Sequence, residues 1–248
     1  TRANGLFVAV GNEGLIYTSA EGRDWTRRDP GTNFNFRAVT HFNGRYIAVG
    51  EQEPLVPSDR VTIYTSPDAI HWQPAPSVGL SGRGDLYGLA HNEHTIVAVG
   101  NNSTVAVSQD GLNWNDAVGL PVSRDLNAVI WNGTVFYAAG KDGAVLSSLD
   151  GLSWFSLGPG GSRNLHGIAY GNGVLVTVAN GGRYFVGNGN GSWQRYDWRS
   201  TEDLSDIIFA GGRFVAVGDN GIMHTSGDGT NWTRRVNPSH NDLRSVSY

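Results

Sequence analysis

The 248-residue chain contains no cysteine, a single methionine and no long apolar run. The absence of cysteine excludes a disulfide framework, cysteine-ligated metals and thiol catalysis. No apolar run approaches the roughly 18 residues of a membrane helix, so we expect no membrane insertion. Only 16% of the residues are charged, and the net charge is −4 without a basic block. Nucleic acid is therefore not an expected partner.

Glycine, by contrast, is abundant, with 35 residues in the chain. These glycines have no three-residue period, which excludes collagen, and they indicate many tight turns. Hydrophobic residues make up 39% of the chain, which is typical of a folded protein rather than a disordered one.

A short apolar run that ends in glycine or alanine recurs about every 40 residues along the chain. Its six copies are Phe7–Gly11, Tyr46–Gly50, Ile96–Gly100, Phe136–Gly140, Leu175–Ala179 and Phe214–Gly218. The period also continues from the last copy, past the C-terminus, to the first copy. The repeat therefore closes on itself.

Each unit has three further landmarks. A second apolar strand follows the run, at Leu15–Thr18, Thr62–Thr65, Val105–Val107, Ala144–Ser147, Arg183–Val186 and Ile222–Thr225. A turn then leads to a tryptophan, at Trp25, Trp72, Trp114, Trp154, Trp193 and Trp232. The last landmark is a strand of the form Leu-x-small-Val/Ile, at Phe36–Val39, Leu86–Leu89, Leu126–Val129, Leu165–Ile168, Leu204–Ile207 and Leu243–Val246.

These landmarks predict four short strands in each unit, rich in β-branched and aromatic residues and separated by Gly/Asn/Asp turns. No window has a sustained helical period, so we expect essentially no helix. Four strands in about 40 residues is typical of a propeller blade, and closure of a propeller removes exposed sheet edges. We therefore predict an all-β fold, a six-bladed β-propeller with four antiparallel strands per blade.

We expect residues 1–248 to form a single domain. The first unit lacks its opening strand, and the strand Leu243–Tyr248 lacks a continuation. Together the two fragments would complete one blade. The closing blade then combines residues 1–30 with residues 241–248, a closure of the velcro type.

The turn before the tryptophan follows the pattern Ser-x-Asp-Gly-x-x-Trp in five units, at Ser19–Trp25, Ser66–Trp72, Ser108–Trp114, Ser148–Trp154 and Ser226–Trp232. Four copies retain the aspartate, and the first has Glu21 instead. The pattern resembles the Asp-box of BNR-repeat propellers, a class that includes sialidases, sortilin-like receptors and photosystem assembly factors. The resemblance covers the whole chain and implies the propeller fold, but a fold does not determine an activity.

We interpret the acids of these turns as structural staples. A carboxylate or hydroxyl oxygen accepts backbone N–H groups across a tight turn, while glycine adopts positive φ. The tryptophan would anchor the outer strand against the neighbouring sheet. A calcium site is the alternative, but it needs several carboxylates and no loop has them. We therefore expect no metal and no cofactor.

Binding residues are better sought among the positions that differ between units, on the face opposite these turns. One such set occupies the x of Leu-x-small-Val, close to the expected propeller axis: Arg37, Tyr87, Asn127, His166, Ser205 and Arg244. These side chains would form a cup for an anionic or hydroxyl-rich ligand. The alternative is that they only fill the channel.

The turns after the glycine-terminated strands would add the carboxylates Glu51, Glu53 and Asp219 at the same channel mouth. Most of these turns have hairpin composition and need no function. The second unit differs, because its turn expands to residues 51–60 and its following connection, Pro74–Asp85, is also long. Such an insertion favours a functional loop, with a merely tolerated loop as the alternative.

These observations favour a ligand-binding or interaction propeller that binds a carbohydrate or another polar ligand at the channel mouth. Carboxylates at the mouth would also suit a glycoside hydrolase or another carbohydrate-active enzyme. However, Arg37, Tyr87 and Arg244 match only part of the catalytic set that the resemblance to sialidases implies, and no Arg-Ile-Pro motif is present. We favour a binding role over an enzyme, and a rigid scaffold for protein partners is the remaining alternative.

We expect the ligand to be a glycan or a small polar molecule, with a protein partner as the alternative, and the chain to be a monomer. The resemblance to Asp-box proteins and the lysine-poor composition favour a secreted or periplasmic location.

Overall fold

The computed structural model describes residues 1–51, 63–75, 80, 84–158, 163–198, 201–237 and 240–248. These residues contain 24 strands and three single-turn 3₁₀ helices, but no α-helix. The strands form six antiparallel sheets of four strands each, and each sheet uses strands that are consecutive in sequence. The predicted all-β fold with six four-stranded blades is therefore confirmed. No helix among the described residues has the length and apolar character needed to cross a bilayer.

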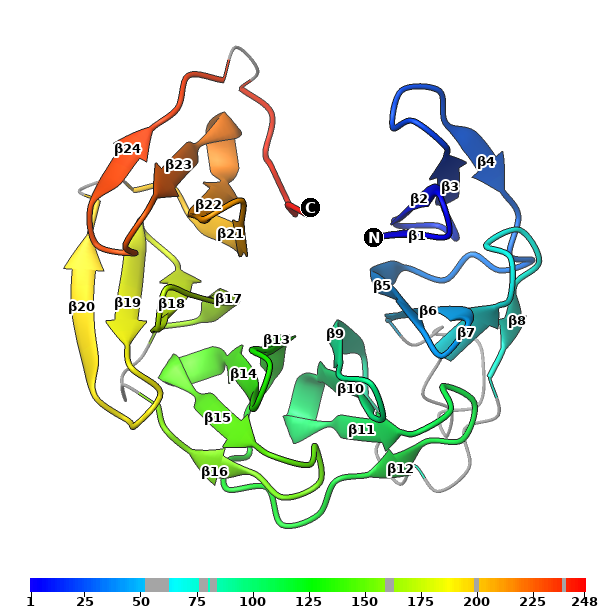
Figure 1. Ribbon diagram of the computed structural model, residues 1–248, viewed down its shortest axis with the longest axis horizontal. Coiled ribbons are helices and arrows are strands. Elements are labelled where there is room, and N and C mark those ends of the chain that lie inside the picture. Colours follow the sequence, from blue (N-terminus) through cyan, green and yellow to red (C-terminus); the bar gives the residue numbers. More distant parts are fainter. Residues whose placement is uncertain (52–62, 76–79, 81–83, 159–162, 199–200, 238–239) are drawn as a thin grey trace. The chain divides into compact units, whose positions relative to one another are not determined.

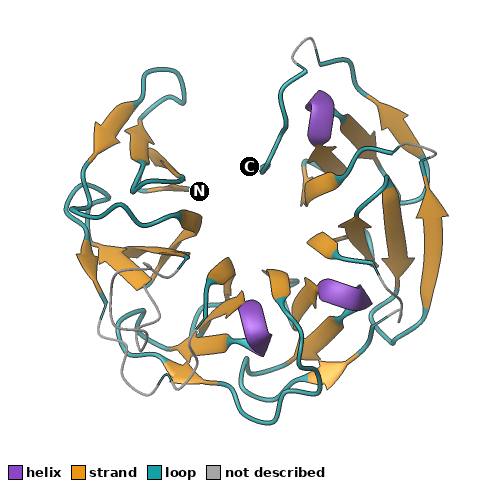
Figure 2. Ribbon diagram, turned by 180° about the vertical axis from the view of Figure 1, so that it is seen from behind, coloured by secondary structure: helices purple, strands orange, loops and turns teal. Residues whose placement is uncertain are grey.

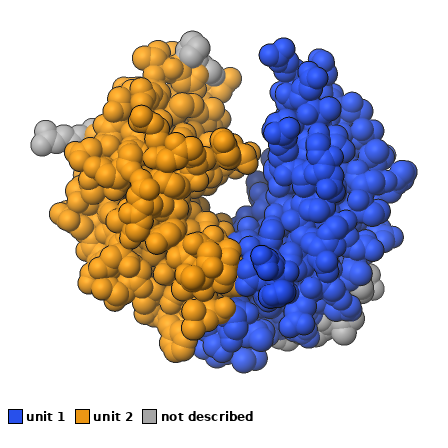
Figure 3. Space-filling model, in the orientation of Figure 1, with its two compact units in different colours: residues 1–125, 150–153 blue, residues 126–149, 154–248 orange. Residues whose placement is uncertain are grey.

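The chain divides into two compact units, which Figure 3 shows in different colours. Unit 1 consists of Thr1–Asp125 and Asp150–Ser153, and unit 2 of Leu126–Leu149 and Trp154–Tyr248. Each unit contains three of the sheets.

The sheets of unit 1 are labelled in Figure 1. The first sheet contains β1 (Arg2–Ala3), β2 (Leu6–Val10), β3 (Ile16–Ser19) and β4 (Thr26–Arg28). The second contains β5 (Phe36–Phe42), β6 (Arg45–Gly50), β7 (Ile63–Ser66) and β8 (Gln73–Pro74). The third contains β9 (Leu86–His91), β10 (Ile96–Gly100), β11 (Val105–Ser108) and β12 (Asn115–Asp116).

Unit 2 repeats this arrangement. The fourth sheet contains β13 (Leu126–Trp131), β14 (Phe136–Gly140), β15 (Val145–Ser148) and β16 (Phe155–Ser156). The fifth contains β17 (Leu165–Gly171), β18 (Val174–Ala179), β19 (Arg183–Gly187) and β20 (Trp193–Asp197). The sixth contains β21 (Leu204–Ala210), β22 (Arg213–Gly218), β23 (Met223–Ser226) and β24 (Trp232–Arg234). Within each unit, the first strands of successive sheets lie side by side.

The core of each unit lies between neighbouring sheets. The second strands are largely buried in several sheets, as in β6, because a neighbouring sheet of the same unit covers each of its faces. One core cluster of unit 1 combines Ile47 and Val49 of the second sheet with Ile96 and Ala98 of the third. Stacking of sheet on sheet thus explains why these strands are continuous apolar runs rather than alternating ones.

In three sheets a single 3₁₀ turn connects the second and third strands. These turns are drawn in purple in Figure 2: η1 (Asn101–Ser103), η2 (Lys141–Gly143) and η3 (Asp219–Gly221). The central residue is left-handed in each, with φ of 49° at Asn102, 52° at Asp142 and 54° at Asn220. Asn and Asp adopt this conformation more readily than other non-glycine residues.

The first sheet is built from the N-terminal part of the chain. All four of its strands come from residues 2–28, and residues 240–248 contain no strand. The predicted blade shared between residues 1–30 and 241–248 would join unit 1 to unit 2 and stays a prediction. Within unit 1, Thr1 exchanges two backbone hydrogen bonds with Val8 of β2, at 2.9 and 3.1 Å. This pairing continues into β1, which is the first strand of the sheet.

The C-terminal segment is held within unit 2. The backbone N–H of Leu243 donates to the carbonyl oxygen of Gly218 at 3.0 Å. In the same way, the N–H of Phe36 donates to the carbonyl oxygen of Gly11 at 3.0 Å, directly at the start of β5. Residue Leu243 thus occupies the position at which a first strand begins, although no strand follows.

Candidate functional site

The variable x position of the Leu-x-small-Val strands coincides with an irregularity in the sheet. The pairing of the first and second strands skips one residue there, so Arg37, Asn127, His166 and Ser205 have no cross-strand partner. The same skip leaves out Tyr87 in β9. A β-bulge redirects the side chain of its extra residue and is a common feature beside functional sites. The bulge therefore gives the predicted candidate residues a shared structural setting.

Several of these candidates line one cavity in unit 2, which we call the Arg244 pocket. The pocket has a volume of about 200 Å³ and is lined by His166, Asp203, Leu204, Ser205, Asp219 and Arg244. His166 and Ser205 come from bulges in neighbouring first strands, Asp219 begins the η3 turn, and Arg244 lies in the C-terminal segment. Of the predicted site residues, His166, Asp219 and Arg244 line this cavity, and the packing of the fifth and sixth sheets brings them together.

The charges of the Arg244 pocket are mixed. The Arg244 guanidinium donates to the Asp242 carboxylate at 2.7 Å and lies 3.8 Å from the Asp219 carboxylate, yet its side chain is 74% exposed. The second ring nitrogen of His166, Nε2, is buried and has no hydrogen-bond partner among the described residues. The pocket therefore offers a cation, two carboxylates and an imidazole within one small volume.

The sequence analysis missed Asp203 as a pocket residue. Its carboxylate accepts the backbone N–H of Gly181 at 2.8 Å and the side-chain amide of Asn180 at 3.0 Å. Burial alone would raise the pKa of Asp203, but these two hydrogen bonds and the nearby His166 outweigh it, so its pKa is lowered. Asp203 is therefore ionised at neutral pH.

A repeated signal in the sequence would have identified Asp203. An Asp or Asn directly before the first strand accepts the backbone N–H of the preceding sheet's turn in several units. Asn35 accepts the N–H of Glu13 at 2.9 Å, and Asp125 accepts that of Asn102 at 2.9 Å. Asp242 binds the N–H of Asn220 in the same way, at 3.1 Å. In these units, the Asp or Asn side chain thus links the turn of one sheet to the segment that follows it in sequence.

Asn127 is placed differently from the prediction. Its side-chain amide donates to the backbone carbonyl oxygen of Leu165 at 2.7 Å. This bond connects β13 to the bulge of β17, so the amide N–H is used within unit 2. Asn127 is not among the residues that line the Arg244 pocket.

The candidates of unit 1 form a separate group. Arg37 forms an ion pair with Glu51 and also donates to the side-chain oxygen of Asn12 at 3.3 Å. Glu51 in turn accepts the amide of Asn35 at 2.7 Å. Burial would raise the pKa of Glu51, but the bonds from Arg37 and Asn35 and the Arg37 charge lower it. The predicted cation and carboxylate therefore neutralise each other.

Tyr87 lies close to this pair in unit 1. Burial raises the pKa of its hydroxyl, and the carboxylates of Asp85, Asp125 and Glu51 raise it further. Tyr87 is therefore a neutral hydroxyl at physiological pH. Glu53 and most of the predicted insertion at residues 51–60 lie outside the described residues.

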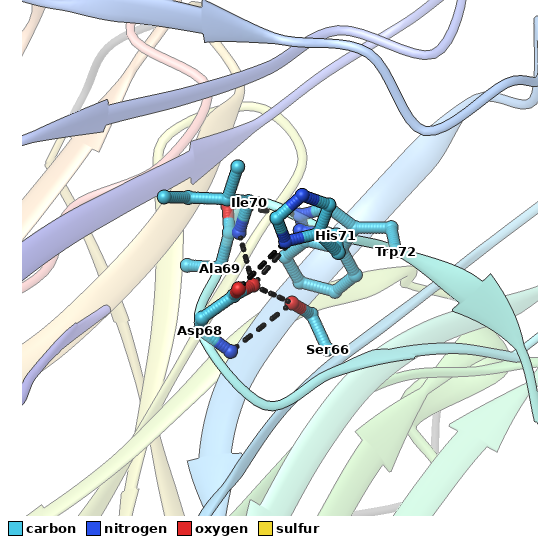
Figure 4. Close-up of polar contacts among 6 residues, drawn as sticks. All are labelled: Ser66, Asp68, Ala69, Ile70, His71 and Trp72. Atoms are coloured by element: carbon cyan, nitrogen blue, oxygen red, sulfur yellow. Dashed lines mark hydrogen bonds and ion pairs between the residues drawn. The ribbon is translucent and has the colours of Figure 1, made fainter.

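The Ser-x-Asp turns have the stapled geometry that was predicted. Figure 4 shows one of them, with the residues Ser66, Asp68, Ala69, Ile70, His71 and Trp72. The Asp68 carboxylate accepts the backbone N–H of Ile70 at 2.9 Å and of His71 at 2.8 Å, and it bonds the His71 ring at 2.7 Å. The backbone N–H of His71, followed by its ring, holds the pKa of Asp68 well below its usual range. The Asp68 carboxylate therefore uses its acceptor oxygens within its own turn.

The tryptophans that follow the turns are buried in three sheets. Trp72 is 8% exposed, Trp114 is 0% exposed and Trp154 is 4% exposed. Trp114 packs on the second sheet, the one before its own, which confirms its predicted anchoring role. Trp25 differs, because it is 42% exposed in the first sheet, which has no preceding sheet within unit 1.

Three or more His, Asp or Glu side chains suited to hold a metal ion do not occur together anywhere in the described part of the chain.

Comparison with known proteins places the fold. A family model described as the DUF6242 beta propeller domain matches residues 66–203. No curated protein matches the chain. Among solved structures, the computationally designed Ika8 protein has a TM-score of 0.66 at 14% identity, covering 93% of this chain and 71% of that one.

Two further similar structures are of the protein YCF48. The structure of YCF48 bound to D1 peptide has a TM-score of 0.70 at 17% identity, covering 92% of this chain and 76% of that one. YCF48 from Cyanidioschyzon merolae has a TM-score of 0.70 at 16% identity, covering 93% of this chain and 81% of that one. At this level of identity, the likeness concerns the fold alone.

Proposed function

The chain belongs to the family of DUF6242 β-propeller domains, and we propose that it is an interaction propeller that binds an extended segment of a protein partner. The Arg244 pocket would receive a side chain of that segment. The observation that carries the proposal is the convergence of His166, Asp219 and Arg244 on one cavity of about 200 Å³. His166 and Asp219 do not serve the repeat, since they differ from their counterparts in the other units, and Arg244 is matched only by Arg37.

The size and chemistry of the pocket support a peptide. A cavity of this volume accommodates one side chain rather than a folded domain, and its donors and acceptors match the mixed polarity of an extended backbone. A protein of the same fold, YCF48, has been solved bound to D1 peptide. That structure supports the idea that a propeller scaffold presents a peptide site.

The carbohydrate ligand predicted from the sequence is less favoured. No Phe, Tyr or Trp lines the Arg244 pocket, so the pocket offers no large apolar ring on which a sugar would stack. The glycan therefore becomes the competing outcome of the experiment below.

Glycoside hydrolysis is also less favoured. A general acid at neutral pH needs a carboxyl with a raised pKa, whereas the pKa of Asp203 is lowered. The carboxyl of Asp206 does have a raised pKa because it is buried, but it does not line the pocket. Asp203 therefore lacks the raised pKa that this role needs.

Two further predictions accompany the proposal. The stapled geometry of Ser66 and Asp68 supports the placement of these turns in the Asp-box class. We also propose that the protein is secreted or periplasmic and that it acts as a monomer. Fractionation of the source cells and size-exclusion chromatography test these two points.

The main experiment presents the purified protein to a displayed library of random peptides and, in parallel, to a glycan array. We expect peptides to be enriched and their affinity to fall about tenfold or more in Arg244→Ala, as the loss of a charge-assisted contact implies. Arg213→Ala is the matched control, because Arg213 is exposed and lies at the opposite end of β22 from Asp219. Enrichment of glycans alone, or equal peptide affinity in Arg244→Ala, would overturn the proposal.

A further inference from the structure

A second cavity in unit 2 is also lined by Asp219, and we call it the Arg234 pocket. It has a volume of about 260 Å³, and its polar and aromatic lining consists of Trp198, Glu202, Asp219, Asn220, His224 and Arg234. Asp219 also lines the Arg244 pocket, so the two cavities share one wall. The lining comes from the end of β20, the η3 turn, β23 and β24, which the packing of the fifth and sixth sheets brings together.

His224 is a lining residue of this cavity whose residue type is not explained by packing alone. It is the second residue of its strand β23, and the same position holds Tyr17 in β3 and Tyr64 in β7. His224 is only 8% exposed, and its Nδ1 has no hydrogen-bond partner among the described residues. Buried polar groups normally have partners, and a missing partner needs an explanation. A ligand that reaches this wall would supply one.

Trp198 serves packing in the same cavity. Its ring stacks on that of His224, with the ring centroids 4.1 Å apart. The ring centroids of Tyr184 and Trp232 lie 5.0 and 4.9 Å from that of Trp198. With three aromatic neighbours around it, the indole holds the imidazole in place. It does not offer an open platform on which a sugar or aromatic ligand would stack.

The charged lining of the Arg234 pocket consists of one guanidinium, that of Arg234, and the carboxylates of Glu202 and Asp219. Arg234 is the cross-strand neighbour of His224 in β23 and β24, and it is exposed. Its side chain makes no hydrogen bond or ion pair with any described residue, whereas Asp219 lies 3.8 Å from Arg244 and Glu202 has interactions of its own. Burial, together with the Arg234 charge, lowers the pKa of His224 to about 4, so the imidazole is neutral at pH 7. Among the described residues, the Arg234 guanidinium is therefore the charged group of this pocket without a partner.

We propose that the Arg234 pocket binds the carboxylate of an acidic side chain, an Asp or Glu of the same partner segment that fills the Arg244 pocket. The inference rests on the proposed function in assigning the two pockets to one segment. Arg234 would donate two hydrogen bonds to the carboxylate, the geometry that guanidinium groups favour. His224 would donate a third from its protonated ring nitrogen.

The shared wall supports occupation by one extended segment. In an extended chain, side chains two residues apart lie on the same face and are separated by about 6–7 Å. Two pockets that share Asp219 in their lining suit such a pair. The acidic residue would then recur at a constant spacing from the residue that fills the Arg244 pocket.

The test uses a simple probe, N-acetyl-glutamate amide, with the neutral N-acetyl-glutamine amide as its isosteric control. The side-chain resonances of His224 are followed by NMR during titration. We expect the glutamate probe to shift these resonances and to raise the pKa of His224, because a nearby anion favours the imidazolium form. The glutamine probe should leave both unchanged.

Two variants complete the test. Arg234→Gln should weaken binding of the glutamate probe about tenfold or more. Arg235→Gln is the matched control, because Arg235 is the next residue along and donates to Thr225 at 2.8 Å instead. No response of His224, an equal response to both probes, or equal binding by Arg234→Gln would each overturn the inference.

The failure of this inference is distinguishable from failure of the proposed function. If displayed peptides depend on Arg244 but contain no acidic residue and ignore Arg234→Gln, the proposed function stands and the acidic subsite is wrong. If no peptide is enriched but the glutamate probe binds through Arg234, the carboxylate site stands, and its assignment to a partner segment is wrong.

Discussion

The carboxylate of Asp206 accepts a hydrogen bond from the backbone N–H of Val246 at 3.0 Å, and it also accepts the Ser245 hydroxyl at 2.9 Å. In four other first strands the equivalent position holds a small residue, at Ala38, Gly88, Ala128 and Gly167. Burial raises the pKa of Asp206, and the three N–H and O–H donors around it only partly offset this effect. A buried acid thus replaces a small residue where the C-terminal segment must be held.

Asp206→Ala should therefore release the C-terminal segment. The variant leaves the donors of Ser245 and Val246 without an acceptor, and we expect a loss of about 1–3 kcal/mol in unfolding free energy. Hydrogen–deuterium exchange should accelerate at Val246. Glu93→Ala, which removes an exposed acid of unit 1, is the control and should change neither quantity. Unchanged exchange at Val246 in Asp206→Ala would contradict the role of this carboxylate.

The Ser-x-Asp turn of the third sheet, Ser108–Trp114, should make the stability of the protein depend on pH in acidic solution. Asp110 accepts the backbone N–H groups of Leu112 and Asn113, each at 2.8 Å. Burial would raise its pKa, but these bonds and the Asn113 side chain lower it to about 2. Because the folded pKa lies below the unfolded value of 3.8, the contribution is present above that value and is lost as pH falls toward 2.

Asp110→Ala should lower the free energy of unfolding at pH 7 by about 1–3 kcal/mol, because two backbone donors lose their acceptor. Urea denaturation measures this loss, and the variant should show less further destabilisation on acidification than the wild type. Glu21→Ala provides a comparison within the same motif, because Glu21 is exposed in the equivalent turn. Equal losses in the two variants would argue against the carboxylate as the staple.

The repeated tryptophans should differ strongly in their contribution to stability. Trp114 is fully buried, whereas Trp25 is 42% exposed. Trp114→Ala opens a cavity between the second and third sheets, and we expect a loss of about 3–5 kcal/mol. Trp25→Ala should cost clearly less, because much of its ring already contacts water. Thermal denaturation of the two variants compares them, and similar shifts would show that burial does not set the difference.

His224 should make stability fall in mildly acidic solution. Its pKa is lowered from 6.5 to about 4, chiefly by burial, so the unfolded chain binds more protons in this interval. The contribution is complete above pH 6.5 and is lost as pH falls toward 4. His224→Tyr, which introduces the residue type found at Tyr17 and Tyr64, should make the melting temperature depend less on pH across this interval. His94→Gln is the control, since His94 is exposed, and it should keep the slope.

The repeat made most of the fold predictable. Strands such as Ile96–Gly100 and Phe136–Gly140 are found where the apolar runs indicated, because β-branched residues and flanking turn residues act locally. The strand Leu243–Val246 was predicted by the same pattern, and no strand forms there within unit 2. A strand needs a partner as well as a pattern, and the predicted partner of this segment belongs to unit 1.

The candidate site was less predictable, although its residue types were informative. Arg37 and Arg244 occupy equivalent positions in the repeat, and the sequence treats them alike. In the structure Arg37 is paired with Glu51, whereas Arg244 is largely exposed beside a pocket. Their surroundings come from residues on other strands and turns, and those residues do not repeat.

The sequence by itself therefore determined the six four-stranded sheets, their order and the stapled turns, because strand alternation, glycine turns and Ser-x-Asp bonds act over a few residues. Only the tertiary structure decided which polar side chains share a cavity. His166, Asp219 and Arg244 meet through the packing of separate sheets, and His224 meets Arg234 only through strand pairing. Such contacts depend on long-range geometry, which no local pattern of residues encodes.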